Sequence, residues 1–140
     1  MSVFDRLIRH LGLDGHPPVP TFTLGASAMS QFVMLLWESP ASFATTSPAE
    51  MESIITEYVA WRQRMGAAGK ITGGHKLRDE GGKHLVGSTV AEGPYAEATE
   101  VIGGLFEVSA ANYQEAVEIA RSCPHLRFGR IELREVEPTE

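Results

Sequence analysis

The sequence lacks the features of a disulfide scaffold, a membrane protein or a metalloprotein. Its 140 residues contain a single cysteine, Cys123, so no internal disulfide can form and a reducing cytoplasm is the expected compartment. No apolar run approaches the ~20 residues that span a bilayer, and the stretch MSVFDRLIRHLGLDG lacks the apolar core of a signal peptide. No HxH, HExxH or CxxC spacing occurs. We therefore expect neither a metal nor another cofactor.

Positive charge is also scarce. Twelve basic residues against eighteen acidic ones give a formal net charge of −6, which argues against nucleic-acid and anionic-membrane binding because both need a basic surface. The Gly-Gly pairs in TGG and IGG do not precede a helix with Lys-Ser/Thr, so they are not phosphate loops. No Gly-x-Ser-x-Gly occurs, which leaves hydrolase chemistry without support.

The length and the hydrophobic content of 43% suit one domain that builds its core without a disulfide or a metal. Residues 1–28 are expected to form an extension, with a short amphipathic helix followed by the stiff segment HPPVP. Residues 29–140 are expected to form the domain itself.

Two segments are apolar on both alternating faces, which is typical of central strands covered on both sides: residues 31–38 and 101–110. A helix is predicted after the first, with Ser47 as N-cap, Pro48 at the first helical position and Glu50 completing a capping box. A second helix is predicted from about residue 113 to 122, opened by a capping box of Asn112 and Glu115. Short strands are expected at 70–77 and from residue 84.

The last strand is predicted within LRFGRIELREVE. Leu126 and Phe128 would lie on one face of a strand, whereas Ile131 and Leu133 would lie on the other face. This change of face predicts a β-bulge near Gly129. The element order is then β-α-β-(hairpin)-β-α-β, an α+β ferredoxin-like split βαβ sheet with an inserted hairpin, whose first and third strands are central. Two helices cover only one face of such a sheet, so a homodimer with facing sheets, a dimeric α+β barrel, is expected.

The turn EGPY supplies the first candidate site residues. Glu92 either accepts backbone N–H bonds within the turn or acts as a general base or substrate anchor at the edge of a cleft. Gly93 shapes the turn, and Tyr95 brings a ring and a hydroxyl to the mouth of a central strand. His75 follows two glycines and is either a proton shuttle or an exposed histidine.

The remaining candidate residues are interpreted mainly as parts of the hydrophobic core. Cys123 lies on the apolar stripe of a helix and is interpreted as a buried structural thiol. Tyr58, Trp37 and Trp61 are expected in the core, although one of them, with Trp61 as the candidate, can line an aromatic pocket.

Three segments carry a family resemblance: EGPYAEATEVIGGLFEV, YQEAVEIARSCPHL and GRIELREVEP. Together with SPAEM and GAAGKITGG they make residues 31 to 138 resemble the YCII-related family, and specifically its DGPF branch. The resemblance implies a ferredoxin-like fold, a dimer and an active-site cleft. It also implies that some relatives are cofactor-free enzymes and others accessory or regulatory proteins.

The sequence departs from the family pattern at the site. Glu92 stands for the family's aspartate, Tyr95 for its phenylalanine and Thr99 for a common lysine. The histidine that pairs with an aspartate in the enzymatic branch falls near Glu57, so that dyad is not carried over. The candidate substrate-binding residues are Tyr95, Gly93, Glu57 and Trp61.

Two functions remain open from the sequence. One is a cofactor-independent lyase or isomerase acting on a small molecule in a cleft, with Glu92 and His75 handling protons. The other is a non-catalytic binding, accessory or regulatory protein that uses the same cleft. An enzyme requires Glu92 or His75 to converge on one concave pocket, whereas side chains in separate solvent regions favour binding.

Overall fold

The computed structural model describes residues 29–39, 45–93 and 99–138. The predicted extension, residues 1–28, and the predicted site residue Tyr95 lie outside these ranges. A four-stranded antiparallel sheet in the order β2-β5-β1-β6 forms the body of the domain. Its strands are β1 (Ser30–Glu38), β2 (Ile71–Lys76), β5 (Val101–Ala110) and β6 (Arg130–Glu135). The two doubly apolar segments are therefore the central strands, and the ferredoxin-like α+β fold is confirmed.

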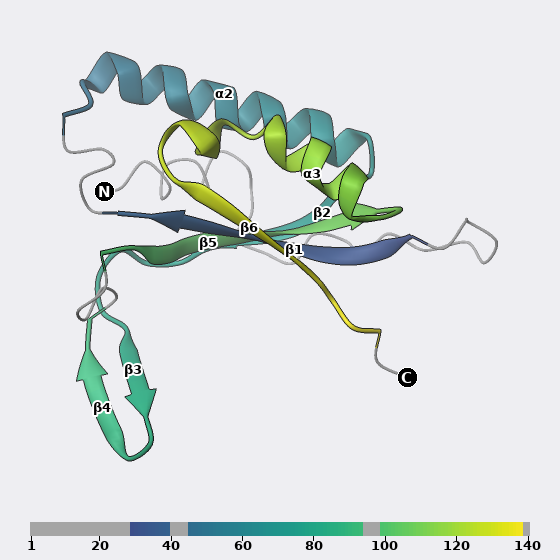
Figure 1. The fold of residues 1–140 in the computed structure, drawn as a ribbon. Helices are drawn as coiled ribbons and strands as arrows, with labels where there is room; N and C mark the ends of the chain where they lie inside the picture. Colours follow the sequence, from purple (N-terminus) through teal and green to yellow (C-terminus); the bar gives the residue numbers. More distant parts are fainter. Residues whose placement is uncertain (1–28, 40–44, 94–98, 139–140) are drawn as a thin grey trace.

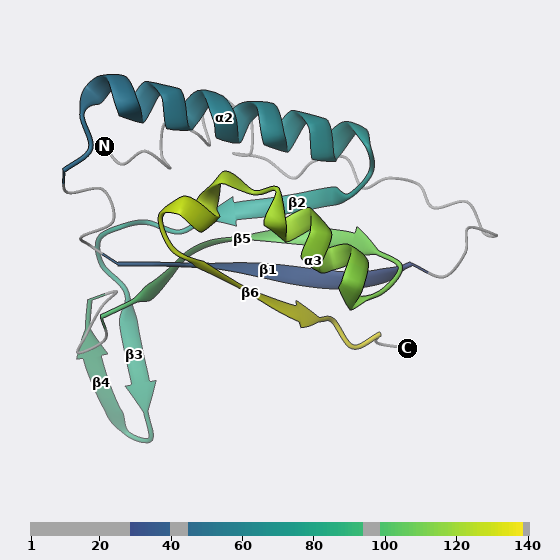
Figure 2. The same cartoon turned by 45° about the horizontal axis from the view of Figure 1, so that its top comes forward.

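Both helices cover the same face of the sheet, as Figures 1 and 2 show: α2 (Pro48–Ala67) and α3 (Tyr113–Arg121). The capping box that opens α2 is present, because Ser47 Oγ accepts from the Glu50 N–H and the Glu50 carboxylate accepts from the Ser47 N–H. Gly69, with φ of +72°, follows the C-cap of α2. At α3, Asn112 is the N-cap and its side chain accepts from the Glu115 N–H.

The core lies between the helices and the covered face of the sheet. It includes aromatic and aliphatic side chains from α2, from the central strands and from the start of β2: Phe32, Met34, Leu36, Ile54, Ile55, Tyr58, Trp61, Ile71, Phe106 and Val108. Cys123 is 3% exposed, and burial raises the pKa of its thiol to about 12, so it is the structural thiol that the sequence predicts.

The segment before β6 differs from the prediction. Pro124–Arg127 form a 3₁₀ helix, and the strand begins only at Arg130. The change of apolar parity at Gly129 is therefore the boundary between a helical turn and a strand, and the predicted β-bulge there is wrong. Register shifts occur instead in the pairing of β1 with β5, between Leu36 and Trp37, and in the pairing of β2 with β5, between Ile71 and Gly73.

A separate hairpin, β3 (Lys83–Val86) and β4 (Thr89–Glu92), projects from the face opposite the helices (Figure 1). All eight of its strand residues are exposed, including Leu85, Val86 and Val90. A two-stranded hairpin has little stability by itself, so this element depends on what it contacts.

Candidate functional site

A cavity of about 620 Å³ opens where β1 ends, β5 begins and the hairpin leaves the sheet. Its apolar lining comes from Trp37, Leu77, Val101 and Ile102. The polar lining comes from the segment that leads into β3, from β3 itself and from the residue before β5: Arg78, Glu80, Lys83, His84 and Glu100. This volume lies within the range of small-molecule sites, about 300–1,000 Å³, and a mainly apolar lining with a few polar groups is typical of them.

Trp37 forms one wall and is held from two sides. Its indole N–H donates to Glu132 Oε1 at 3.0 Å, and the Arg130 guanidinium carbon lies 4.3 Å from the ring centroid. Arg130 in turn donates from Nε to both oxygens of Glu100, at 3.1 and 3.2 Å. A cation over an aromatic ring and an N–H···carboxylate bond together fix the plane of the indole.

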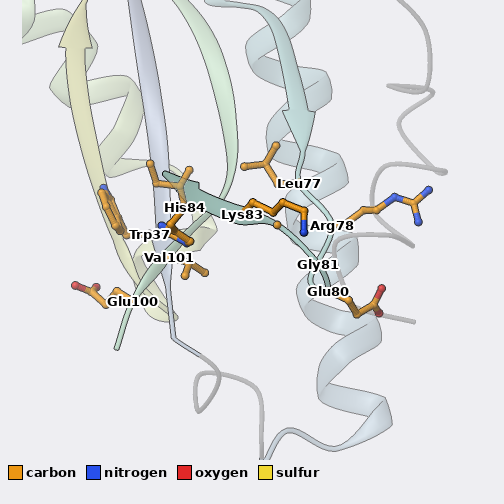
Figure 3. A pocket seen from close by; sticks show the side chains of 11 residues that line it. Trp37, Leu77, Arg78, Glu80, Gly81, Lys83, His84, Glu100 and Val101 are labelled. Atoms are coloured by element: carbon orange, nitrogen blue, oxygen red, sulfur yellow. The ribbon is translucent and has the colours of Figure 1, made fainter. Parts of the chain in front are cut away.

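The polar lining residues point in different directions in Figure 3. His84 and Lys83 lie near the centre of the cavity, whereas the end groups of Arg78 and Glu80 point away from Trp37. Lys83 Nζ donates to both carboxylate oxygens of Glu92, at 2.6 and 2.7 Å, across the hairpin. His84 and Lys83 are therefore the groups placed to meet a polar atom of a ligand.

Behind this wall, a buried network holds the backbone of Trp37. The Nε2 atom of His125 lies 2.8 Å from the Trp37 carbonyl oxygen, which can only accept, so Nε2 carries the proton. The Nδ1 atom of His125 then accepts from the Tyr58 hydroxyl at 3.0 Å. Burial lowers the pKa of His125, and the bond to Trp37 opposes this with a smaller effect. The lowered pKa keeps the ring neutral. At Gly129 a Cβ atom would collide with the same carbonyl, so only glycine fits there.

Glu38 follows Trp37 but lies on the helix side of the strand. It is 6% exposed, and among the described residues its Oε2 atom has no hydrogen-bond partner. Burial raises the pKa of this carboxyl, with Lys76 acting in the opposite direction and Asp79 adding a smaller increase. Its carboxylate fills the space that a side chain at Gly103 would need, which explains the glycine at the bulge.

The two residues predicted to be catalytic do not meet at this cavity. Glu92 ends β4, is exposed, and pairs with Lys83. His75 is exposed on β2, on the sheet face that carries no helix, where it is the cross-strand neighbour of Leu105. Neither side chain lines the cavity, so the catalytic roles of Glu92 and His75 remain predictions.

The residues predicted to bind substrate are also dispersed. Gly93 adopts φ of +90°, which suits glycine, and its N–H donates to the Gly82 carbonyl at 2.9 Å. Glu57 is an exposed residue of α2 that forms an ion pair with Arg127. Trp61 is 1% exposed and donates from Nε1 to Ser122 Oγ at 2.8 Å, within the core.

Trp37 and His84, which line the cavity, do not belong to the predicted site residues, although the sequence leaves open that one of the core aromatic residues lines a pocket. Trp37 was interpreted as core, because a central strand predicts burial on both faces. His84 was one of several histidines without a distinguishing motif. A usable signal was the aromatic residue at the end of a central strand, since ligands often bind at such ends.

Two kinds of feature are absent from the described residues. No helix there is long and apolar enough to cross a membrane. No group of three or more His, Cys, Asp or Glu side chains that could hold a metal ion occurs in the ranges that the structure covers.

Comparison with known proteins gives one positive result. The sequence model of the YCII-related domain matches residues 30–140, a range that includes the four-stranded sheet, both helices and the hairpin. Comparison with curated proteins gives no significant match. The match confirms the family expected from the sequence, whereas assignment to the DGPF branch stays a prediction.

Proposed function

Because the chain belongs to the YCII-related family, we propose that it binds a small, partly apolar molecule in the cavity beside Trp37. The observation that carries the proposal is the cavity itself, about 620 Å³ in volume, with an apolar wall and two polar groups near its centre. The apolar part of the ligand packs against Trp37 and Ile102, and a polar atom of the ligand meets Lys83 or His84. Burial of the apolar part supplies most of the affinity, at about 25 cal/mol per Å² before the costs of association.

The experiment is a small-molecule thermal-shift screen followed by titration of the hits. Leu77 lines the cavity and is 42% exposed, so Leu77→Arg should fold and place a long charged side chain at the opening. We expect it to weaken the binding of a hit at least ~10-fold, or ~1.4 kcal/mol. Leu126→Arg is the matched control, because Leu126 is 46% exposed on the 3₁₀ helix and does not line the cavity. Equal affinities for both variants would place the ligand elsewhere.

Catalysis by the same cavity is the second candidate. His84 favours it, because an imidazole in a ligand cavity can act as a general acid or base and so serve a cofactor-independent lyase or isomerase. Hits from the screen would be tested for turnover with the wild-type protein and with His84→Gln. A hit that binds both proteins and is converted by neither supports the non-catalytic function.

We also propose that the protein is a cytoplasmic homodimer. The sheet face without helices has an apolar centre of half-buried side chains, Val33, Leu35 and Leu105, which a facing sheet would cover. The buried free thiol of Cys123 suits a reducing compartment. Sedimentation or light scattering at micromolar concentration tests the assembly, and a monomer would refute it.

A further inference from the structure

The charged residues that line the cavity differ in where their end groups lie. In Figure 3 the end groups of Arg78 and Glu80 point away from the indole wall, and the carboxylate of Glu100 points away from Lys83. The ammonium of Lys83 lies near the centre, with the imidazole of His84 beside it. The acidic groups of the lining therefore face outward, whereas a cation faces inward.

Two ion pairs beside the cavity have one partner in its lining and one partner outside it. Lys83 lines the cavity, and its counter-ion Glu92 does not. Glu100 lines the cavity, and Arg130, which donates to both of its oxygens at 3.1 and 3.2 Å, does not. Because the carboxylate of Glu100 is already paired and points outward, the charge that a ligand meets is that of Lys83.

The ammonium of Lys83 keeps one donor after its ion pair is formed. A lysine ammonium has three N–H donors and no acceptor. Two of them reach the oxygens of Glu92, at 2.6 and 2.7 Å. Within residues 29–39, 45–93 and 99–138, these two oxygens are the hydrogen-bond acceptors that Lys83 Nζ contacts. A ligand acceptor can therefore bind the third N–H without breaking the pair.

The aromatic wall of the cavity also has positive charge behind it. The Arg130 guanidinium carbon lies 4.3 Å from the centroid of the Trp37 ring, on a side that does not line the cavity. The face of an indole ordinarily attracts cations, but here Arg130 already uses that attraction. A cationic ligand on the cavity side would be repelled by Arg130 and by Lys83.

The number of available donors limits the charge of an anionic ligand. Phosphate groups are typically bound by several donors or by the fork of an arginine, whereas Lys83 offers a single N–H. The chain also has a formal net charge of −6, which repels a dianion more strongly than a monoanion. A carboxylate carries one charge and accepts the one bond that is available.

We propose that the ligand of this cavity is a small carboxylate, whose apolar body packs against Trp37 and whose carboxylate accepts from the remaining N–H of Lys83. The inference rests on the cavity binding proposed above and adds the chemical class of the ligand. It also identifies Lys83 as the residue that distinguishes an acid from its neutral and cationic analogues. A hydrogen bond between two charged groups is roughly twice as strong as a neutral one, which is the source of the preference.

Four probes with the same apolar body test the charge of the ligand: 2-naphthoate, 2-naphthamide, 2-naphthylmethylammonium and 2-naphthyl phosphate. Isothermal titration calorimetry near neutral pH measures their affinities. We expect 2-naphthoate to bind at least ~5-fold more tightly than the amide, because its bond to Lys83 is charge-assisted. The ammonium compound should bind most weakly, and the phosphate should bind no more tightly than the carboxylate.

Two lysine variants test the residue that sets this preference. Lys83→Met keeps an unbranched side chain of similar length without the charge, and should bring the carboxylate and the amide to within about twofold of each other. Lys70→Met is the matched control, because Lys70 precedes β2 and does not line the cavity, and it should keep the wild-type ratio. Circular dichroism checks that each variant folds.

The neutral probe separates this inference from the proposed function. Leu77→Arg obstructs the cavity opening, so it should weaken the binding of 2-naphthamide if the cavity is the site. An amide that is sensitive to Leu77→Arg but binds as tightly as the carboxylate leaves the cavity binding intact and overturns the carboxylate class.

The other outcomes are equally specific. Tighter binding of the phosphate than of the carboxylate overturns the monoanion. A carboxylate preference that persists in Lys83→Met overturns the role of Lys83. Failure of all four probes to bind at millimolar concentration overturns the cavity binding and the carboxylate class together.

Discussion

The two tryptophans lie on opposite faces of the sheet and are held by opposite means. Trp61, on the helix side, is 1% exposed, packs edge-on against Phe106 at 5.4 Å, and donates to the neutral hydroxyl of Ser122. Trp37, on the other face, donates to the carboxylate of Glu132 and lies under the guanidinium of Arg130. Neutral partners suffice where water is excluded, whereas charged partners are tolerated where they stay partly hydrated. The difference identifies one face as core, and it fits the other face as the surface on which we propose that a ligand binds.

Truncating each tryptophan should give the largest effects and separate these roles. Trp61→Ala should lower the free energy of unfolding by about 3–5 kcal/mol, the usual cost of removing a buried tryptophan. Trp37→Ala should lower it by only about 1–2 kcal/mol, since it loses one hydrogen bond and one cation–π contact. It should nevertheless remove ligand binding in the cavity. Urea unfolding and titration of a ligand measure the two effects, and equal losses of stability would contradict the comparison.

The buried network behind Trp37 should make stability depend on pH. The pKa of His125 is lowered in the folded state, so below the ordinary value of 6.5 the unfolded chain binds a proton that the folded chain does not. Stability due to neutral His125 is thus complete above about pH 6.5 and is lost as the pH falls toward the folded-state pKa. Urea midpoints at pH 7.5 and 5.5 measure the loss.

Two variants sharpen this test. His125→Gln should remove the dependence in that pH window, because no group at this position then titrates. Tyr58→Phe should cost about 1–3 kcal/mol, since it leaves the Nδ1 atom of a buried imidazole without its donor. An unchanged pH dependence in His125→Gln would assign the effect to another group.

Glu38 should make stability depend on pH in the opposite direction. Its pKa is raised in the folded state, so the folded chain holds a proton that the unfolded chain has lost, and stability falls as the pH rises above the ordinary value of 4.5. Glu38→Gln keeps the shape of the side chain without the charge and should stabilise the protein at pH 7 by less than about 1 kcal/mol. The gain should vanish at pH 4. Destabilisation at pH 7 would mean that the attraction of Lys76 outweighs the cost of burial.

The fold was predictable because its signals are local. Apolar residues on both faces identified β1 and β5, and the hydroxyl of Ser47 with the carboxylate of Glu50 identified the start of α2. The error at Gly129 arose because a parity change looks the same for a bulge and for a strand that follows a helical turn. The local sequence does not distinguish them.

The site was harder to predict because it depends on distant residues. Trp37 is held in the cavity wall by contacts with Glu132 and Arg130, which are more than ninety residues away in the chain. Glu92 and His75 carry the right chemical groups, but one lies on the hairpin and the other on an edge strand. Residue type alone suggested a shared site, and the structure places the two residues on different elements, so their catalytic roles stay predictions.

The smallest effect is expected at Glu92. Both partners of its ion pair with Lys83 are exposed, with 75% of the Glu92 side chain and 60% of the Lys83 side chain accessible. Glu92→Gln should therefore change the free energy of unfolding by less than about 1 kcal/mol. Glu118→Gln on α3 is the matched control, since Glu118 belongs to a similarly exposed pair.

Binding is the informative readout. If Glu92 only restrains Lys83, its loss frees a cation that lines the cavity, and an anionic ligand should bind equally well or a few-fold more tightly. If Glu92 is a base or an anchor, binding or turnover should fall at least ~10-fold, or ~1.4 kcal/mol. The exposed pair favours the first result, and a tenfold loss would restore Glu92 to the site.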